Sequence, residues 1–381
     1  MNKFVHRLRS RLYLGARTNG LVADWGYWGT HHFEEMTLKL RYYWRKWVSS
    51  RFVPEAEVLK LRFLDSSAML QTGVASICNA KCVFCAYPKV VAAKTFQPTI
   101  MSFEVFKKAI DEWAKAGGKS LDMTWTLGDP LVDPGLLQKV DYAINQAHME
   151  EVGFTTNGIL LDRNDTYKKL VDLGINAVFI STPGTNKEVY EKIYGVNKYA
   201  EAISGIHHLL EYNHSKGDPV RIVIRYRNAE KPSEILNSPD FIKYVKPYLS
   251  GRVLINFTVD YDNWAGTIVK GDMSGVMRMR SLPPQLNLPC QRLFTYAIRH
   301  DGSVRLCGCR IKTTDMDDMI VGTIREKSLE EISRSDVVKD IISGFYHGKR
   351  PLVCQECTFY TPVNRKWLKS REARHSAMPV S

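Results

Sequence analysis

The chain has 381 residues and is 44% hydrophobic, which allows one large domain together with a smaller one. No run of about 18 apolar residues occurs, so we expect no transmembrane helix. The net charge of +13 favours acidic partners, but no block of Lys and Arg stands out, so nucleic acid is not specifically indicated.

The cellular compartment follows from the cysteines and the N-terminus. Eight cysteines in a chain of this length do not indicate a disulfide scaffold, and their clustering indicates metal ligation where thiolates stay reduced. The basic N-terminus lacks the apolar core and cleavage site of a secretory signal. We therefore expect a cytoplasmic protein.

Residues 1–65 form a basic, aromatic-rich extension, with twelve Lys and Arg against six Asp and Glu. The segment 33–48 is predicted to be helical, because its apolar residues recur at helical spacing. These residues are Phe33, Met36, Leu40, Trp44 and Trp47. One interpretation is a helix packed on the main domain by this stripe. The other is an interfacial helix at a membrane surface, because aromatic and basic side chains together suit that location.

Three cysteines follow in the pattern Cys78-x3-Cys82-x2-Cys85. Three thiolates hold three corners of a [4Fe–4S] cube, which normally takes four. The fourth iron then keeps an open position, as a catalytic metal does when it binds a substrate. The alternative is part of a zinc or redox site, but zinc motifs usually pair C-x2-C with a second pair at finger-like distance. No Cys or His lies between Cys85 and His148.

The cysteine spacing resembles that of the radical S-adenosylmethionine (SAM) superfamily. The resemblance implies that the open iron chelates SAM, and that reductive cleavage gives methionine and a 5′-deoxyadenosyl radical that abstracts hydrogen from an unactivated carbon. The family also favours an aromatic residue before the third cysteine, beside the adenine. Phe84 takes that place here, although an ordinary apolar loop anchor would look the same.

The segment 66–285 alternates strands and helices. Six strands are predicted, at 70–76, 121–127, 152–157, 177–182, 220–226 and 253–259. The helix before the second strand is predicted to begin at the N-cap Ser102 and to end at Gly117. Six such units in series predict parallel strands with right-handed crossovers. This agrees with the partial (β/α)6 TIM-like barrel that the resemblance implies, whose active site lies at the carboxyl ends of the strands.

The resemblance also implies residues that contact SAM. Leu127-Gly128-Asp129-Pro130 stands where the family often has Gly-Gly-Glu-Pro, and this partial match is also ordinary turn chemistry. The runs after the third and fourth strands resemble the family's TNG motif and its ribose-contacting serine. An arginine on the fifth strand is the candidate partner of the SAM carboxylate. The implied SAM-binding residues are Gly128, Asp129, Thr156, Asn157, Ser181 and Arg225.

The segment 286–381 differs in character and holds five of the eight cysteines. Two short strands around Asp301-Gly302 are predicted to form a hairpin. The cysteine pattern resembles the SPASM/twitch extension of radical SAM enzymes, and the cysteine number suits the shorter, twitch-type α+β iron–sulfur domain. The implied ligands of one auxiliary [4Fe–4S] cluster are Cys290, Cys307, Cys354 and Cys357. A four-cysteine zinc site is the alternative.

Cys309 is left over once seven cysteines are assigned. A spare thiol beside two clusters could be inert, could replace Cys307 as a ligand, or could donate hydrogen to a substrate radical. Radical SAM epimerases use such a thiol, and we take Cys309 as the predicted catalytic residue of an epimerase. Twitch-type dehydrogenases, which oxidise an alcohol through the auxiliary cluster, and peptide-modifying enzymes are the alternatives.

The predicted substrate is a small polar molecule such as a carbohydrate. Phosphorylated and lipid-linked carbohydrates are among the candidates. Asp260, Asp262, Asn263 and Trp264 could bind the substrate's hydroxyl groups, although a capped strand end with a packed Trp explains them equally well. The family implies a reducing partner such as flavodoxin or ferredoxin. A non-catalytic iron–sulfur electron carrier is the rival class, but electron transfer needs no open iron.

Overall fold

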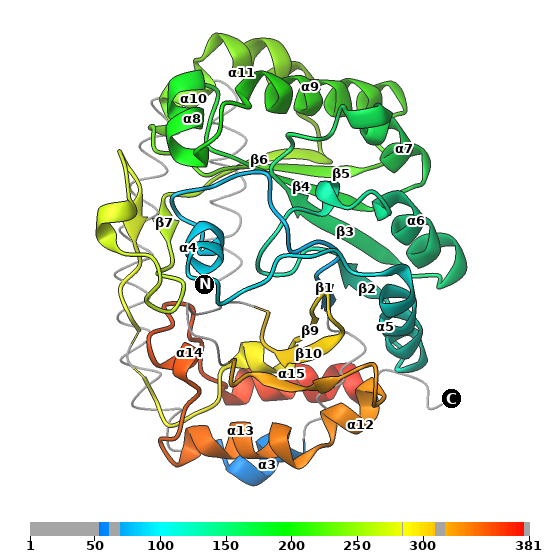
Figure 1. Ribbon diagram of the computed structural model, residues 1–381, viewed down its shortest axis with the longest axis vertical. Helices are drawn as coiled ribbons and strands as arrows, with labels where there is room; N and C mark the ends of the chain where they lie inside the picture. Colours follow the sequence, from blue (N-terminus) through cyan, green and yellow to red (C-terminus); the bar gives the residue numbers. More distant parts are fainter. Residues whose placement is uncertain (1–52, 61–68, 284, 309–316, 377–381) are drawn as a thin grey trace.

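The computed structural model describes residues 53–60, 69–283, 285–308 and 317–376, with side chains as far as residue 370 (Figure 1). The helix predicted at 33–48 and the thiol of Cys309 lie outside these ranges. Among the described residues, nine strands form one sheet in the order β11-β10-β9-β1-β2-β3-β4-β5-β6.

The first six strands are parallel and lie in chain order. They are β1 (Met69–Thr72), β2 (Ser120–Asp122), β3 (Glu151–Thr156), β4 (Ala177–Thr182), β5 (Arg221–Tyr226) and β6 (Val253–Phe257). The pairing of β4 with β5 is continuous from Ala177↔Arg221 to Thr182↔Tyr226. This confirms the six predicted β/α units, arranged as a partial barrel whose strand order does not return from β6 to β1.

The second strand is shorter than predicted, because it ends at Asp122 rather than at Leu127. The Asp122 carboxylate accepts a hydrogen bond from the backbone nitrogen of Thr124 at 2.9 Å. Such a local bond forms a turn and takes the backbone out of the sheet ladder. The apolar alternation of 121–127 therefore continues into a packed loop.

Helices between the strands cover one face of the sheet (Figure 1). They are α5 (Phe103–Lys115), α6 (Leu136–Asp141) with a π turn at Tyr142–Gln146, α7 (Thr166–Asp172), α8 (Lys187–Tyr194), α9 (Tyr199–Ser215), α10 (Pro232–Leu236) and α11 (Pro239–Tyr244). Helix α4 (Tyr87–Ala92) belongs instead to a separate buried cluster with Trp125 and Trp264. The predicted start of α5 is confirmed, since the Ser102 hydroxyl accepts from the Val105 backbone nitrogen at 3.3 Å.

The C-terminal strands continue the same sheet. They are β9 (Tyr296–Ile298), β10 (Ser303–Leu306) and β11 (Ile320–Thr323). Strand β9 pairs parallel with β1, while β10 pairs antiparallel with both β9 and β11, which confirms the predicted hairpin. The segments before and after residue 285 therefore share one sheet. The domain boundary at 285/286 stays a prediction.

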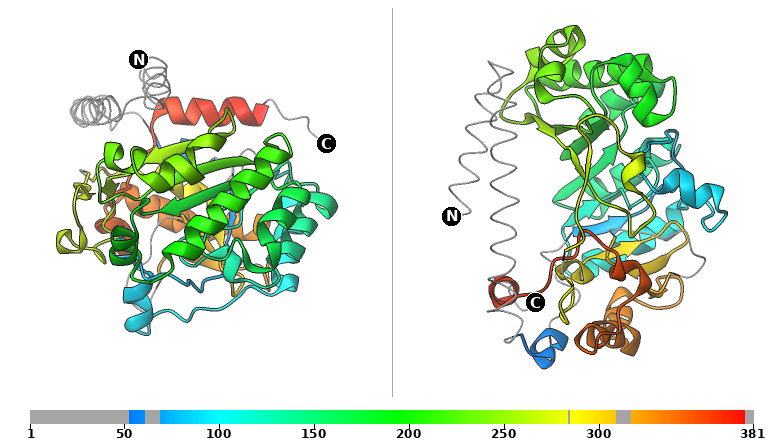
Figure 2. Two further views of the ribbon diagram at one scale, coloured as in Figure 1. Left: turned by 90° about the horizontal axis from the view of Figure 1, so that it is seen from above. Right: turned by 90° about the vertical axis from the view of Figure 1, so that its left-hand side faces the viewer.

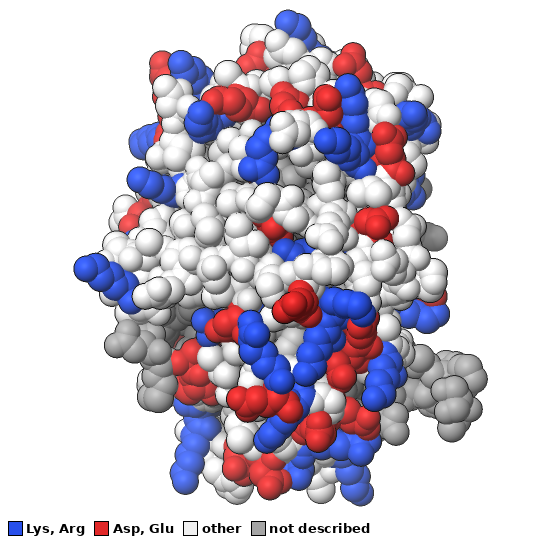
Figure 3. All heavy atoms as spheres, turned by 45° about the vertical axis from the view of Figure 1, so that its right-hand side comes forward, with Lys and Arg blue, Asp and Glu red and all other residues white. Residues whose placement is uncertain are grey.

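The remaining α-helices and strands lie outside the nine-stranded sheet. They are α3 (Glu55–Leu59), a two-stranded pair of β7 (Asp260–Tyr261) and β8 (Arg278–Met279), α12 (Leu329–Ser333), α13 (Asp336–Tyr346), α14 (Leu352–Gln355) and α15 (Arg365–Ser376). Both views of Figure 2 place α15 on the opposite side of the molecule from α4. Figure 3 shows acidic and basic side chains interspersed on one face, so the positive charge does not gather into one patch there.

The two faces of the parallel strands differ in polarity, because successive side chains point to opposite sides. On β4 and β5, Val178, Ile180 and Ile224 are fully buried in the core beneath the helices. The alternate residues Phe179 and Arg225 are only half-buried. We call this second side, away from the helices, the inner face.

A buried ion pair between Lys139 and Asp133 allows the cost of an unpaired buried charge to be tested. Lys139 and Asp133 have side chains only 3% and 2% exposed, and the Lys139 ammonium also donates to the Met101 carbonyl at 2.6 Å. Replacing Asp133 with Ala leaves the Lys139 charge unpaired, so we expect a loss of about 3–5 kcal/mol of unfolding free energy.

The measurement is denaturant unfolding of the anaerobic holoprotein. Glu201→Ala is the matched control, because it removes an exposed pair with Lys198, whose two side chains are about half exposed. Exposed pairs contribute at most about 1 kcal/mol. Equal losses in the two variants would contradict this account of the buried pair.

Candidate functional site

The three N-terminal cysteines lie in the loop that follows the carboxyl end of β1, where active sites of such folds occur. Backbone hydrogen bonds attach this loop to the end of α8. Lys81 donates to the Tyr194 carbonyl at 2.8 Å, and Val83 donates to the Ile193 carbonyl at 3.0 Å. Gly195, with φ of 64°, ends α8 so close to the loop that a Cβ would lie 3.0 Å from the Lys81 carbonyl oxygen. Helix α8 therefore positions the cysteine loop.

The thiols of this loop lie within electrostatic range of one another. Burial, together with the charges of Asp129 and Cys85, raises the pKa of the Cys78 thiol to about 12. Burial and the two neighbouring cysteines also raise the pKa of Cys82. A cationic iron–sulfur centre would favour the thiolates and reverse these effects, so the donor set fits such a group.

No group of three or more Cys, His, Asp or Glu side chains in the described ranges forms a site for a single metal ion. An iron–sulfur cube does not need that arrangement, because its thiolates bind different iron atoms. The mutual influence of the three thiols is the observation that supports a cluster at this loop.

Asp129, Thr156 and Asn157 lie together, whereas their role in SAM binding stays a prediction. The buried Asp129 carboxylate accepts from the Thr156 hydroxyl at 2.9 Å and from the Asn157 backbone nitrogen at 2.7 Å. It also accepts from the Leu131 backbone nitrogen at 3.0 Å. The Asn157 amide nitrogen donates to Asn79 at 2.6 Å and lies 3.9 Å from the Cys78 sulfur. The side chain of Asp129 thus binds neighbouring loops, and its backbone carbonyl accepts from the Val132 backbone nitrogen at 3.1 Å, so its contact with SAM stays a prediction.

Gly128 lies directly against the cysteine loop. Its φ of 97° is unfavourable for other residues, and a Cβ would stand 2.1 Å from the Ala75 carbonyl oxygen. The backbone nitrogen of Asp129 donates to the Ile77 carbonyl at 2.9 Å, one residue before the first cysteine. The turn at 128–129 therefore holds the base of the cysteine loop.

Ser181 accepts two side-chain hydrogen bonds at the end of β4. The Tyr194 hydroxyl donates to its oxygen at 3.2 Å, and Arg227 donates through Nε at 3.3 Å. The positive charge of Arg227 also lowers the pKa of Cys82, against the larger effect of burial, so this guanidinium lies within electrostatic range of the cysteine loop. Sequence reasoning missed Arg227, although its position two residues after Arg225 places it on the same face of the extended chain.

Arg225 itself lies deeper on the inner face. Its guanidinium is 4.1 Å from the centre of the Phe179 ring, and burial lowers its pKa to about 10. Asp122 lies within electrostatic range, and burial raises the pKa of its carboxyl to about 6, opposed by hydrogen bonds from Thr124 and by the charge of Arg225. Gln71, the register partner of Asp122 on β1, also lowers the pKa of this carboxyl. Asp122 and Gln71 were not predicted, because only the pairing of β1 with β2 brings them together.

Phe84 packs among aromatic rings, with its ring centre 5.1 Å from that of Tyr261 and 6.1 Å from that of Tyr194. Its predicted place beside adenine stays a prediction. Trp264 is only 8% exposed and donates from its indole nitrogen to the Phe84 carbonyl at 2.7 Å. Asp262 accepts from the Trp264 backbone nitrogen at 3.0 Å. This segment has the capped turn and packed Trp of the alternative interpretation, and hydroxyl binding by it stays a prediction.

Four C-terminal cysteines come together at the other end of β1. Strand β9 is parallel to β1 and β10 is antiparallel to it, so Cys290 before β9 and Cys307 after β10 lie toward the amino end of β1. Burial, then the charges of Cys290 and Cys357, raise the pKa of Cys354. The role of these four cysteines as ligands stays a prediction.

Arg305 stands beside this cysteine set. It is 1% exposed, pairs with Asp317 at 2.8 Å and donates to the backbone carbonyl of Cys307. The charges of Cys307 and Cys354 help to raise its pKa. A fixed guanidinium at this place favours thiolates, and therefore favours a site for a thiolate-bound iron–sulfur cluster.

The catalytic candidate Cys309 lies outside the described residues, but its neighbour Gly308 is described. The Gly308 carbonyl accepts from the Thr126 hydroxyl, and a Cβ on Gly308 would meet the side-chain oxygen of Gln71 at 1.8 Å. The backbone thus passes from the auxiliary cysteines onto the inner face immediately before Cys309.

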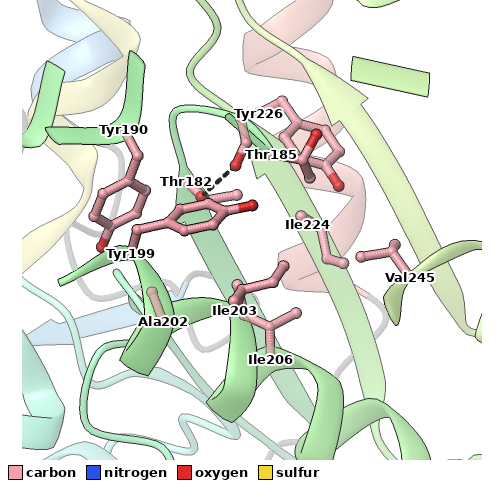
Figure 4. A pocket seen from close by; sticks show the side chains of 11 residues that line it. Thr182, Thr185, Tyr190, Tyr199, Ala202, Ile203, Ile206, Ile224, Tyr226 and Val245 are labelled. Atoms are coloured by element: carbon pink, nitrogen blue, oxygen red, sulfur yellow. Dashed lines mark hydrogen bonds between the residues drawn. The ribbon is translucent and has the colours of Figure 1, made fainter. Parts of the chain in front are cut away.

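A small cavity lies between the helices and the sheet (Figure 4). Tyr190, Tyr199 and Tyr226 line it together with Ile206 and Ile224. The hydroxyls of Tyr190 and Tyr226 are buried without a partner among the described residues. Since Ile206 and Ile224 belong to the core beneath the helices, this cavity is separate from the inner face.

The fold and the two cysteine sets define an iron–sulfur protein built on a partial α/β barrel. The family model of the radical SAM superfamily matches residues 73–236, and that of the iron–sulfur cluster-binding SPASM domain matches 290–358. The chain therefore belongs to the radical SAM superfamily and carries a SPASM domain. These domains imply SAM and two [4Fe–4S] clusters as cofactors, whereas the finer twitch assignment stays a prediction.

Curated relatives match part of the chain. GTP 3′,8-cyclase of Petrotoga mobilis is 29% identical over 142 residues, which are 37% of this chain and 42% of the relative. GTP 3′,8-cyclase of Staphylococcus haemolyticus is 26% identical over 178 residues, which are 46% of this chain and 50% of the relative. The chain thus spans about half the length of these curated relatives or less.

Two solved structures are similar at low identity. BtrN in complex with AdoMet and 2-DOIA has a TM-score of 0.48 and 16% identity, covering 76% of this chain and 92% of that chain. Native anSMEcpe with bound AdoMet and Kp18Cys peptide has a TM-score of 0.48 and 14% identity, covering 80% of this chain and 95% of that chain. Within the described residues, no helix is both long and apolar enough to cross a bilayer.

The first prediction from the site concerns Gly128. Replacing it with Ala should push the Cys78 loop from its place, because the added Cβ overlaps the Ala75 carbonyl. The N-terminal cluster should be lost, and the iron content of reconstituted protein should fall from about eight to about four per chain, given four irons per cube.

Gly174→Ala is the matched control. Gly174 has a similar φ of 79°, but a Cβ there would meet nothing within 4 Å, so only the backbone strain is shared. This variant should keep its iron. Iron loss in both variants would mean that strain alone, and not the contact with the loop, disrupts the cluster.

The second prediction separates the two cysteine sets. Changing Cys78, Cys82 and Cys85 together to Ala should halve the iron and abolish SAM cleavage by dithionite-reduced protein. Changing Cys354 and Cys357 to Ala should remove the other half and leave the N-terminal motif intact. Survival of SAM cleavage in the triple variant would refute the assignment of the N-terminal motif.

Proposed function

We propose that this radical SAM enzyme abstracts hydrogen from a C–H bond of a small polar substrate on its inner face. The finer proposal is that it epimerises that carbon, with Cys309 as the hydrogen donor. The observation that supports substrate binding is a polar group: Gln71 and Asp122 are register partners on β1 and β2, and Arg225 lies within electrostatic range of Asp122.

The polar group suits a substrate rich in hydroxyl groups. Arg225 offers a rigid set of donors, because its guanidinium stacks on Phe179 at 4.1 Å. Asp122 offers an acceptor, and Gln71 offers both donor and acceptor. A phosphorylated substrate would also pair with Arg225.

Sequence position indicates Arg225 as the partner of the SAM carboxylate, but in this proposal Arg225 binds the substrate. We assign the SAM carboxylate to Arg227, which donates to Ser181 and lies within electrostatic range of Cys82. Arg225 lies with Asp122 instead and is assigned to the substrate.

Epimerisation needs a hydrogen donor at the substrate carbon. Bound SAM and the reduced cluster supply a hydrogen-abstracting 5′-deoxyadenosyl radical. The resulting carbon radical then takes hydrogen from a thiol: the S–H bond breaks, a C–H bond forms and a thiyl radical remains. One electron from a reducing partner of the flavodoxin or ferredoxin class and one proton from solvent restore the thiol. The contacts of Gly308 with Gln71 and Thr126 support Cys309 in this role.

Dehydrogenation of an alcohol is the second candidate, and Asp122 favours it. Oxidation removes the hydroxyl proton as well as hydrogen from carbon. A carboxyl with a pKa of about 6 on the inner face suits proton transfer near neutral pH. A purine nucleotide is a further substrate to test. The curated GTP 3′,8-cyclases favour it, and Arg225 and Arg227 could pair with its phosphates.

The test uses reduced holoprotein in D2O with sugars, cyclitols, their phosphates and GTP. Epimerisation should place one solvent deuterium on the inverted carbon, because the thiol exchanges its hydrogen with solvent. Cys309→Ala should keep both clusters and still form 5′-deoxyadenosine, but it should form no epimer.

Other outcomes favour other functions. Loss of two hydrogens from the substrate would indicate the dehydrogenase, and a cyclised nucleotide would indicate the reaction named for the curated relatives. A chain that never cleaves SAM would be an electron carrier. Iron loss in Cys309→Ala would make Cys309 a ligand and would overturn its role as donor.

A further inference from the structure

One short turn contacts both cysteine loops. The segment 262–266, which we call the bridging turn, follows β7 and holds three successive residues in the left-handed region. These are Trp264 with φ of 48°, Ala265 with 53° and Gly266 with 90°. A bulky residue such as Trp adopts this conformation rarely, and it persists only where surrounding contacts determine it. The contacts of the bridging turn therefore indicate what it does.

On one side the bridging turn binds the N-terminal cysteine loop. The Trp264 indole donates to the Phe84 carbonyl at 2.7 Å, one residue before Cys85. The Trp264 ring lies in a buried cluster with Ala86 and Val90, and Cys85 packs against that cluster. Lys89 adds a second connection, because its ammonium donates to the Thr267 carbonyl at 3.1 Å and to Asp272 at 2.7 Å.

On the other side the bridging turn binds the loop of Cys357. The Asn263 amide nitrogen donates to the Glu356 carbonyl at 2.9 Å. Asn263 also exchanges two hydrogen bonds of 3.3 Å with the Thr358 hydroxyl. Gly266 lies so close that a Cβ would stand 2.6 Å from a Glu356 carboxylate oxygen. Glu356 and Thr358 are the two neighbours of Cys357 in the chain.

We propose that the bridging turn is a positioning element that fixes the auxiliary cysteine loop relative to the radical SAM cysteine loop. Asn263 and Trp264 are adjacent, so their hydrogen bonds to the two loops cannot shift independently. Internal bonds from Gly266 and Ile268 to the Asn263 carbonyl, at 3.0 and 2.9 Å, stiffen the turn. The bridging turn, which follows the edge strand β6, therefore sets the separation of the two clusters together with the sheet.

The test changes the donors of the bridging turn without removing its bulk. Trp264→Phe keeps an aromatic ring but loses the indole donor, and Asn263→Asp places an acceptor opposite the Glu356 carbonyl. The readout is the magnetic coupling between the two reduced clusters, measured by pulsed electron paramagnetic resonance on dithionite-reduced holoprotein. Both variants should keep full iron, and the coupling should shift and spread over a wider range of values.

Trp113→Phe is the matched control. Its indole also donates to a backbone carbonyl, that of Ser120 at 3.2 Å, but it lies on α5 and its hydrogen bond goes to β2 rather than to a cysteine loop. This control should leave the coupling unchanged. If Trp264→Phe folds poorly, Lys89→Met removes the second connection at a side chain 39% exposed and should shift the coupling in the same direction.

Three results would overturn the proposal: unchanged coupling in the bridging variants, an equal change in Trp113→Phe, or loss of iron as the main effect. The last result would make the bridging turn a support for one cluster rather than a link between two. Since the measurement needs no substrate, it can fail or succeed independently of the proposed epimerisation.

Discussion

The buried carboxylate of Asp129 is the interaction on which the rest of the site depends. Burial of this group raises its pKa, and hydrogen bonds from Asn157, Leu131 and Thr156 lower it in compensation. A buried carboxylate without such donors would be strongly unfavourable, so the loops after β2 and β3 must meet at this point. Because Gly128 and the Asp129 backbone hold the base of the cysteine loop, the same interaction positions Cys78.

The shared sheet explains how one chain serves two cysteine sets. Strand β1 lies between β2 and β9, so the strand that leads into the N-terminal cysteines is also the neighbour of the C-terminal hairpin. The two sets lie toward opposite ends of β1, and Gly308 enters the inner face between them. Gln71, which lies against Gly308, is also the register partner of Asp122 on the neighbouring strand.

Contacts across the open side of the barrel complete this arrangement. The strand order ends at β6, so the sheet itself does not join the segment after β6 to the loop before α4. Trp264 and Asn263 supply that connection through hydrogen bonds to Phe84 and Glu356. The strained backbone of the bridging turn is consistent with this role, since strain persists where several contacts require it.

The sequence alone determined the features that local patterns carry. Cysteine spacing indicated the cluster chemistry, and apolar periodicity indicated six β/α units, because both depend on residues close in the chain. The Asp301-Gly302 turn likewise indicated the hairpin. The tertiary structure decided which polar groups meet. Gln71 meets Asp122 because the register of β1 and β2 pairs them, and Arg227 reaches Ser181 from just beyond the end of β5. The packing of Trp264 was also decided there, because its indole donates to the Phe84 carbonyl, which is far away in the chain.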